Sequence, residues 1–237
     1  MDIPILFRDA RFVVLDKPAG LPVHAGPRGG PSVEDCFPAL SRRRDGPWLA
    51  HRLDADTSGC LVVALRRAAL LAAQAAFAEG RVEKVYWAVV RGTPQSEAGV
   101  VEAPLRRHSD PRGWRMLAGP GGQEAVSEWR VLGRGGEKSW LEVRPRTGRT
   151  HQVRAHCAVL GCPVLGDPVY DGGAGRLHLL ARAITLPLDP VVTAVAPVPA
   201  HMRAALLACG WDPLSVTGTG SATATREPRG AGGTPHR

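Results

Sequence analysis

Residues 51–59 (HRLDADTSG) hold the residue types best suited to chemistry in this chain. One carboxylate, Asp54, follows a basic pair, and the segment closes with turn-forming residues, which predicts a loop. The apolar run Cys60–Leu65 comes next and is typical of a buried strand. A carboxylate on a loop braced by a core strand is suited to act as a nucleophile or a charge stabiliser. An acid beside an arginine is more often a solvated ion pair, so this segment needs support from elsewhere in the chain.

A second segment, residues 146–156 (RTGRTHQVRAH), supplies that support. It concentrates arginine and histidine downstream of Asp54. We expect a helix over residues 150–160, ending at Gly161 as a C-terminal cap. His151 and Arg154 lie three positions apart and would share one face of that helix.

Together with three further segments, these two resemble the RluA-type RNA pseudouridine synthases. Residues 51–59 are similar to the family motif HRLDxxTSG, and residues 147–156 to TGRtHQiRvH. The other segments follow in the order of the family: residues 16–24 (DKPAGLPVH), 84–92 (KVYWAVVRG) and 160–170 (LGCPVLGDPVY). The resemblance extends from about Phe7 to about Trp211, which is nearly the whole chain.

The resemblance implies an enzyme that isomerises uridine in ribosomal or transfer RNA to pseudouridine. No metal, nucleotide or redox cofactor is implied. Two chemical routes stay open, one through attack on carbon 6 of the base and one through a glycal intermediate. A uridine in folded RNA must leave its stack to reach a catalytic group, so base flipping is expected.

The resemblance also assigns the catalytic residues. Asp54 aligns with the catalytic carboxylate, and Arg154 with the arginine that pairs with it, as the planar guanidinium is able to do. Tyr86 aligns with the tyrosine that stacks on the target uracil and takes part in proton removal. A tyrosine in a half-buried strand is more often a core residue, but the Lys-x-Tyr context favours the base wall. Asp56 falls at a variable position, and we expect it on the surface or bracing the loop.

Candidate contacts to the RNA or the base come from the same two segments. Arg52 corresponds to an arginine that enters the gap left by the flipped nucleotide or contacts its phosphate. The loop around Asp54 is shaped by its neighbours, Gly59 among them. The full expected set of RNA or base contacts is His51, Arg52, Thr57, Ser58, Arg149 and His151.

Two further groups of residues have weaker assignments. Turns that position Arg154 are expected at Gly148, Gly166 and Asp167. A loop-rich stretch carries candidate phosphate contacts, which a solvated loop would explain equally well: Arg106, Arg107, Arg112 and Arg115.

Two other functions are compatible with part of the pattern. The first is an RNA-binding module that has kept this fold without its activity, although the intact set of Asp54, Tyr86 and Arg154 disfavours it. The second is a glycosidase that uses Asp54 and Asp56 as its carboxylate pair. A basic chain without an aromatic sugar platform disfavours the second.

Composition narrows the classes of protein. The 237 residues carry a net charge of +8, which suits an RNA partner. However, 27 of the 30 basic residues are arginine, and a GC-rich genome also produces this bias.

No apolar run could span a membrane, and no export signal is apparent. Five cysteines without a CxxC pair indicate reduced thiols in the cytoplasm. Four clustered residues fit no standard zinc spacing: His151, His156, Cys157 and Cys162.

The order of elements predicts an α+β fold with a bent, mixed, largely antiparallel sheet. Residues 1–211 would form one catalytic domain, and residues 212–237 a flexible tail poor in large apolar side chains. We expect a monomer that stands alone, without the S4-type RNA-binding domain of many relatives. Expected strands cover residues 12–15, 60–65, 82–90, 126–132, 139–143, 177–186 and 191–196. Expected helices cover residues 32–40, 66–79, 150–160 and 200–209.

Overall fold

The structure, a computed structural model, describes residues 2–26, 29–43, 45–111 and 113–214. Arg112 and residues 215–237 of the expected tail therefore lie outside the described residues. All statements below on what the molecule contains refer to the described part of the chain.

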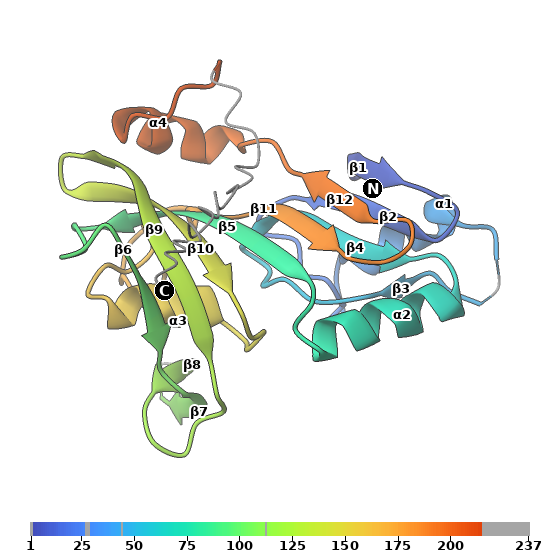
Figure 1. The fold of residues 1–237 in the computed structure, drawn as a ribbon, viewed down its shortest axis with the longest axis horizontal. Helices are drawn as coiled ribbons and strands as arrows, with labels where there is room; N and C mark the ends of the chain where they lie inside the picture. Colours follow the sequence, from blue (N-terminus) through green and yellow to red (C-terminus); the bar gives the residue numbers. More distant parts are fainter. Residues whose placement is uncertain (1, 27–28, 44, 112, 215–237) are drawn as a thin grey trace, which may run out of the picture.

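A large mixed sheet is the centre of the molecule (Figure 1). Its strands run in the order β1-β2-β4-β11-β5-β10-β9-β6, with β3 paired to β4 and β12 to β11. The pair β4–β11 is parallel and the other pairs are antiparallel. The strands are β1 (Ile5–Arg8), β2 (Phe12–Lys17), β3 (Trp48–Leu49), β4 (Ser58–Ala64), β5 (Glu83–Arg91), β6 (Ala98–Glu102), β9 (Val126–Gly135), β10 (Lys138–Pro145), β11 (Leu179–Leu186) and β12 (Val192–Val195). The expected α+β fold with a largely antiparallel sheet is confirmed.

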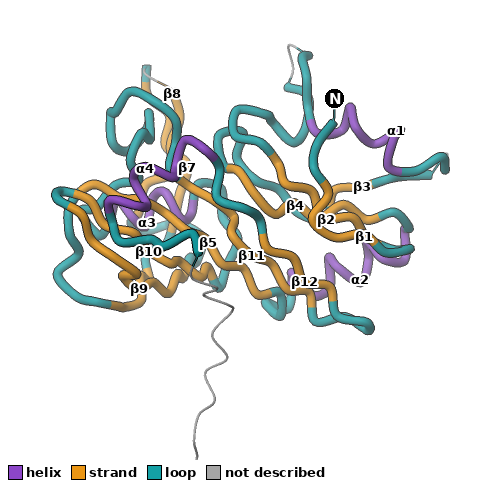
Figure 2. Tube along the Cα trace, turned by 90° about the horizontal axis from the view of Figure 1, so that it is seen from above, coloured by secondary structure: helices purple, strands orange, loops and turns teal. Residues whose placement is uncertain are grey.

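Helices lie at both ends of this sheet, and Figure 2 shows α1 and α2 at one end and α3 and α4 at the other. In chain order they are the 3₁₀ helix η1 (Val33–Cys36), α1 (Phe37–Leu40), α2 (Arg67–Ala78), α3 (Gln152–Val159) and α4 (Ala200–Ala208). In α2 the buried side chains are Ala69, Ala73 and Ala76. Their spacing of four and three places them on one face of the helix. Small side chains on this face let α2 pack close to β3 and β4.

Gly59 fixes the crossing between the loop of Asp54 and the middle of the sheet. Its φ is +104°, a conformation that favours glycine, and a Cβ there would collide with the carbonyl oxygen of Ala181 on β11. The parallel pairing of β4 with β11 begins at this point. The close approach holds the end of residues 51–59 against the centre of the sheet.

The expected helix over residues 150–160 begins later than predicted. Gln152 is its first residue, and His151 before it adopts a left-handed conformation with φ of 54°. The side-chain oxygen of Gln152 accepts hydrogen bonds from the Arg149 N–H and the Thr147 hydroxyl, and these bonds fold the preceding loop. The prediction that His151 and Arg154 share a face of one helix is therefore wrong. Gly161, with φ of +71°, follows the end of the helix as expected.

The stretch that carries Arg106, Arg107 and Arg115 was expected to be rich in loops, and this expectation is also wrong. The stretch forms the antiparallel hairpin of β7 (Leu105–Asp110) and β8 (Gly113–Ala118), which lies beside α3 (Figure 1). Most of its side chains are exposed or half-buried, so the sequence lacks the apolar alternation that marks a strand. Strands β1, β3 and β6 were likewise not predicted. The expected hairpin of residues 126–143 is present, with longer strands.

Candidate active site

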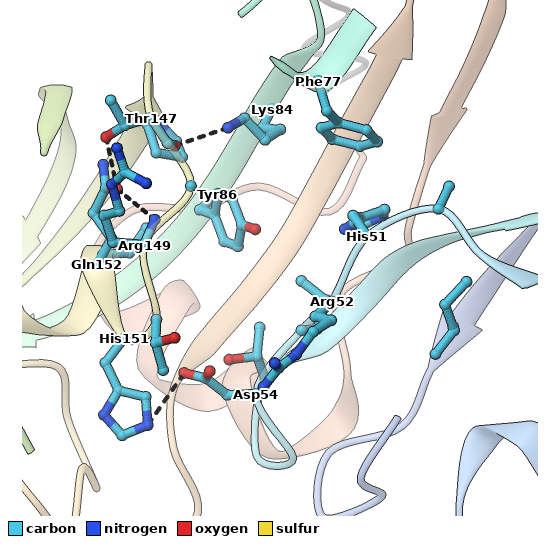
Figure 3. A pocket seen from close by; sticks show the side chains of 18 of the residues that line it. His51, Arg52, Asp54, Phe77, Lys84, Tyr86, Thr147, Arg149, His151 and Gln152 are labelled. Atoms are coloured by element: carbon cyan, nitrogen blue, oxygen red, sulfur yellow. Dashed lines mark hydrogen bonds and ion pairs between the residues drawn. The ribbon is translucent and has the colours of Figure 1, made fainter. Parts of the chain in front are cut away.

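A cavity of about 930 Å³ opens between α2 and α3 and crosses strand β5. One wall is the loop of residues 47–54, and the opposite wall is the loop that leads into α3. Asp54, Tyr86 and Arg154 all line it, although they are far apart in the sequence. Figure 3 shows Asp54 and Tyr86 in the cavity. The fold therefore brings the three expected catalytic residues into one site.

Lys17 braces the loop that carries Asp54. It is fully buried at the end of β2, and its ammonium donates hydrogen bonds to the carbonyl oxygens of Pro18, Leu21 and Ala55 at 2.7–2.9 Å. Burial lowers the pKa of Lys17 to about 8, while the negative charges of Asp56 and Asp54 act against that shift. The buried ammonium therefore ties the backbone directly after Asp54, at Ala55, to the turn that follows β2.

Arg154 joins the site to the core through two carboxylates. Its Nη1 donates to Asp54 Oδ2 at 3.3 Å, while its Nε and Nη2 donate to the two oxygens of Asp167 at 2.7 and 2.8 Å. Asp167 is fully buried, whereas the side chain of Asp54 is 24% exposed. One carboxylate therefore anchors the guanidinium, and the other remains accessible from the cavity.

Aromatic rings link the site to hairpin β7–β8. The Tyr170 ring lies 5.5 Å from the Arg154 guanidinium, and its hydroxyl donates to the Met116 carbonyl and accepts from the Met116 N–H. Trp114 on β8 stacks on His151 with ring centroids 4.7 Å apart. His151 Nε2 is 3.8 Å from Asp54 Oδ2. The side chains of Trp114 and Tyr170 thus connect hairpin β7–β8 to the residues next to Asp54.

Tyr86 stands on β5 in the middle of the cavity, where Figure 3 shows its ring between Asp54 and Lys84. Burial raises the pKa of its phenol, and the negative charge of Asp54 adds to that shift. The hydroxyl is therefore protonated at neutral pH. This state suits a ring that packs on a base and donates a hydrogen bond better than one that acts as an ionised base.

His51 has an internal hydrogen bond rather than an outward contact. Its Nε2 accepts from the Val62 N–H at 3.1 Å, and its ring packs on Phe77 with centroids 5.1 Å apart. Burial lowers the pKa of His51 to about 4, which keeps it neutral. The ring is one wall of the cavity and also ties the loop to β4.

The remaining expected RNA contacts fall into two groups. Arg52 and Arg149 are exposed on opposite walls, and Arg149 Nε donates to the Glu124 carbonyl. Thr57 and Ser58 are buried, and the Ser58 hydroxyl points to the Leu179 carbonyl at 3.5 Å. Ser58 does not line the cavity, so the structure places it beneath the site rather than at a surface open to RNA. Asp56 is exposed on the same loop.

Several residues of the site were not assigned from the sequence. Asp167 was expected only to form a turn, and no role was given to Lys17, Lys84, Trp114 or Tyr170. The sequence around a lysine or an aspartate does not show that its side chain is buried, so the burial of Lys17 and Asp167 becomes visible only in the fold. The isolated Trp114 beside four arginines was the one signal in the sequence for a stacking surface.

No group of three His, Cys, Asp or Glu side chains in the described part of the chain is placed to hold a metal ion. Both ring nitrogens of His156 are in hydrogen bonds, to Ser127 Oγ and the Ala103 carbonyl. All five cysteines are buried and free. Each helix within the described residues is too short or too polar to cross a bilayer.

The family model described as RNA pseudouridylate synthase matches residues 11–159. This chain belongs to the RNA pseudouridylate synthase family. A Zymomonas mobilis protein named as an uncharacterized RNA pseudouridine synthase is 39% identical over 204 residues, which cover 82% of this chain and 93% of that protein. The ribosomal large subunit pseudouridine synthase D of Borreliella burgdorferi is 33% identical over 199 residues, or 79% of this chain and 61% of that protein.

Solved structures of the same family have the same fold. Human RNA pseudouridylate synthase domain containing 4 superposes with a TM-score of 0.73 at 29% identity, covering 87% of this chain and 92% of that one. Human RNA pseudouridylate synthase domain containing 1 superposes with a TM-score of 0.71 at 31% identity, covering 83% of this chain and 83% of that one. The protein is therefore an isomerase that makes pseudouridine in RNA, and the expected resemblance to this family is confirmed.

Proposed function

We propose that this synthase flips a uridine of structured ribosomal or transfer RNA into the cavity, where Asp54 is the catalytic carboxylate. The observation that carries the proposal is the position of Asp54: an accessible carboxylate, oriented by a buried arginine, in the same cavity as a protonated tyrosine. A carboxylate can act as a nucleophile or stabilise positive charge at the anomeric carbon.

The reaction places clear demands on these side chains. The bond from ribose C1′ to N1 breaks, a bond from C1′ to C5 forms, the C5 proton leaves and N1 gains a proton. Atoms and electrons balance without an oxidant. Asp54 would act as a nucleophile or stabilise positive charge while the glycosidic bond breaks, and Arg154 would hold the orientation of Asp54. The Tyr86 ring would pack on the uracil while the uracil turns.

Base flipping has a cost of a few kcal/mol, which contacts to the opened RNA must offset. Arg52, exposed at the rim beside Asp54, is suited to a phosphate or to the vacated stack. Trp114 and His151 form a stacked aromatic surface at the same rim, and both border a second, smaller depression that shares Asp54. Aromatic surfaces of this kind receive unstacked bases.

The test uses the purified protein and its Asp54→Ala and Asp54→Asn variants. Each is incubated with separate pools of unmodified ribosomal RNA and transfer RNA, and the nucleosides are separated by chromatography because uridine and pseudouridine have equal mass. We expect pseudouridine from the wild-type protein alone, with RNA binding kept in both variants. Sequencing of the product at single-nucleotide resolution then identifies the modified uridine. Full activity in Asp54→Asn would remove Asp54 from the catalytic role.

A further inference from the structure

Lys84 is a cation in the cavity without a counter-ion. Within the described residues no carboxylate lies within ion-pair distance of it, and its ammonium makes one hydrogen bond, to the Thr147 carbonyl at 2.9 Å. Two of its three donors therefore have no protein acceptor. A half-buried cation of this kind is stabilised when an anion enters the cavity, because burial without a partner is costly.

The strand geometry puts Lys84 next to the uracil wall. Lys84 and Tyr86 are two positions apart on β5, so both side chains project from the same face of the strand, about 7 Å apart along it. Figure 3 shows Lys84 on the side of Tyr86 that is away from Asp54. A nucleotide whose base packs on Tyr86 therefore has room to place its backbone phosphate beside Lys84.

The cavity continues past Lys84 toward α2. That end is lined by Trp48, by Gln74 and Phe77 of α2, and by the ring of His51, which packs on Phe77. The total volume of about 930 Å³ is at the upper end of the roughly 300–1,000 Å³ of pockets that enclose a whole drug-sized ligand. One pyrimidine ring on Tyr86 leaves this end of the cavity empty, and its aromatic lining is suited to a second base.

We propose that the end of the cavity formed by Lys84, Trp48, His51, Gln74 and Phe77 is a second nucleotide subsite. Lys84 binds the phosphate that joins the target uridine to its neighbour, and the neighbouring base packs on the aromatic surface of Phe77 and Trp48. We call these five residues the Lys84 subsite. This inference rests on the proposed function, because it names what accompanies the flipped uridine.

The electrostatics of Lys84 agree with a site that waits for an anion. Burial lowers its pKa to about 8, with no carboxylate acting against the shift. A bound phosphate would favour the charged form and raise that pKa again. Lys17, the other buried lysine, differs because three carbonyl groups already satisfy it.

The test uses a short RNA stem–loop that carries the uridine identified with the RNA pools. Binding is measured in the inactive Asp54→Asn background for three proteins: the parent, Lys84→Met and Lys138→Met. Lys138 is the matched control, since it pairs with Arg91, seven positions and about 23 Å farther along β5. We expect Lys84→Met to weaken binding by about tenfold to a hundredfold. Its plot of log affinity against log salt should be shallower by about 0.7–0.9, as for one lost phosphate contact, while Lys138→Met matches the parent.

Neutral RNA analogues separate a direct contact from a general effect on the fold. A methylphosphonate is placed on either side of the target uridine, one position at a time. At one of these positions the parent protein should lose about as much affinity as Lys84→Met does, and Lys84→Met should lose nothing more. An abasic neighbour on that side should likewise weaken binding to the parent and have little effect in Phe77→Leu.

Each outcome has a distinct meaning. If neither methylphosphonate weakens binding to the parent, or if Lys84→Met keeps the parent's affinity and salt dependence, the Lys84 subsite is wrong while the proposed function stands. If Lys84→Met and the methylphosphonate each weaken binding, and their effects on the binding free energy add when the two are combined, a direct contact between Lys84 and that phosphate would also be rejected. A wild-type protein that forms no pseudouridine in any RNA pool would overturn the proposed function, and this inference with it.

Discussion

Asp167 holds the guanidinium of Arg154 through two hydrogen bonds, so that its third nitrogen faces Asp54. Arg154 is 3% exposed and Asp167 is fully buried. A buried pair of this kind is rigid because both groups would be costly to leave alone. Asp167 does not line the cavity, and its two hydrogen bonds fix the direction from which Arg154 meets Asp54.

The first prediction concerns Asp167→Asn, which keeps the shape of the side chain and removes its charge. The amide has only one oxygen to accept from Arg154, so one of the two hydrogen bonds is lost. The guanidinium then gains freedom to move away from Asp54. Because a misplacement of about 1 Å can cost about a hundredfold in rate, we expect kcat to fall by about 10- to 100-fold with little change in KM. Single-turnover kinetics on the mapped RNA measure the two separately.

Asp171→Asn is the matched control for that change. Its carboxylate lies four residues farther on and pairs with the exposed Arg91 at 2.7 Å, outside the cavity. We expect near-normal kcat in this variant. An Asp167→Asn protein that keeps wild-type kcat would show that Arg154 does not depend on Asp167 for its position.

The second prediction is that Arg154→Lys retains RNA binding and loses most of its turnover. A lysine ammonium lacks the planar fork, so it cannot bond both oxygens of Asp167 and still reach Asp54. We expect kcat to fall by about a hundredfold, together with a lower melting temperature. Near-normal kinetics in this variant would remove Arg154 from the site.

The third prediction is that Trp114 contributes to RNA affinity rather than to the chemical step. Its ring is 40% exposed, stacks on His151 and carries the Arg107 guanidinium at 5.0 Å on its face. Base stacking on an aromatic side chain contributes about 1–3 kcal/mol. Trp114→Ala should therefore raise KM, while Trp114→Phe restores much of the loss. A change confined to kcat would argue against a stacking surface.

The sequence predicted most strands of the sheet and three candidate residues that the fold brings into one cavity. Regular apolar patterns predicted strands such as β4 and β5, and short motifs pointed to Asp54, Tyr86 and Arg154 as candidates, which all line the cavity. Hairpin β7–β8 was missed because it lacks an apolar pattern of its own, and one of its contacts to the rest of the fold is with Tyr170, more than fifty residues away. The anchoring role of Asp167 and the unpaired state of Lys84 depend on contacts between distant segments, which no local pattern records.

The fourth prediction is a loss of stability in Lys17→Met. Methionine fills much of the same volume but leaves the carbonyl groups of Pro18, Leu21 and Ala55 without their donor. Unsatisfied buried acceptors cost about 1–3 kcal/mol each, offset in part by the removal of a buried charge. We expect a loss of about 3 kcal/mol in urea unfolding at pH 7. Lys138→Met, at the half-buried first residue of β10, should unfold like the wild type.

The fifth prediction is that acid destabilises the protein through His51. Its pKa falls from 6.5 in the unfolded chain to about 4 in the fold, so between these values the unfolded state binds the proton and the native state does not. The free energy of unfolding therefore decreases as the pH falls below about 6.5, and the loss is complete below about 4, at up to about 3 kcal/mol.

The variant His51→Gln tests this prediction, because glutamine can still accept a hydrogen bond from the Val62 N–H but does not titrate. Urea unfolding at pH 7, 6 and 5 should give a smaller decrease for His51→Gln, and the pH dependence that remains should come from other histidines with lowered pKa, such as His156 and His178. Equal decreases in the two proteins would show that the pKa of His51 in the native state is close to its value in the unfolded chain.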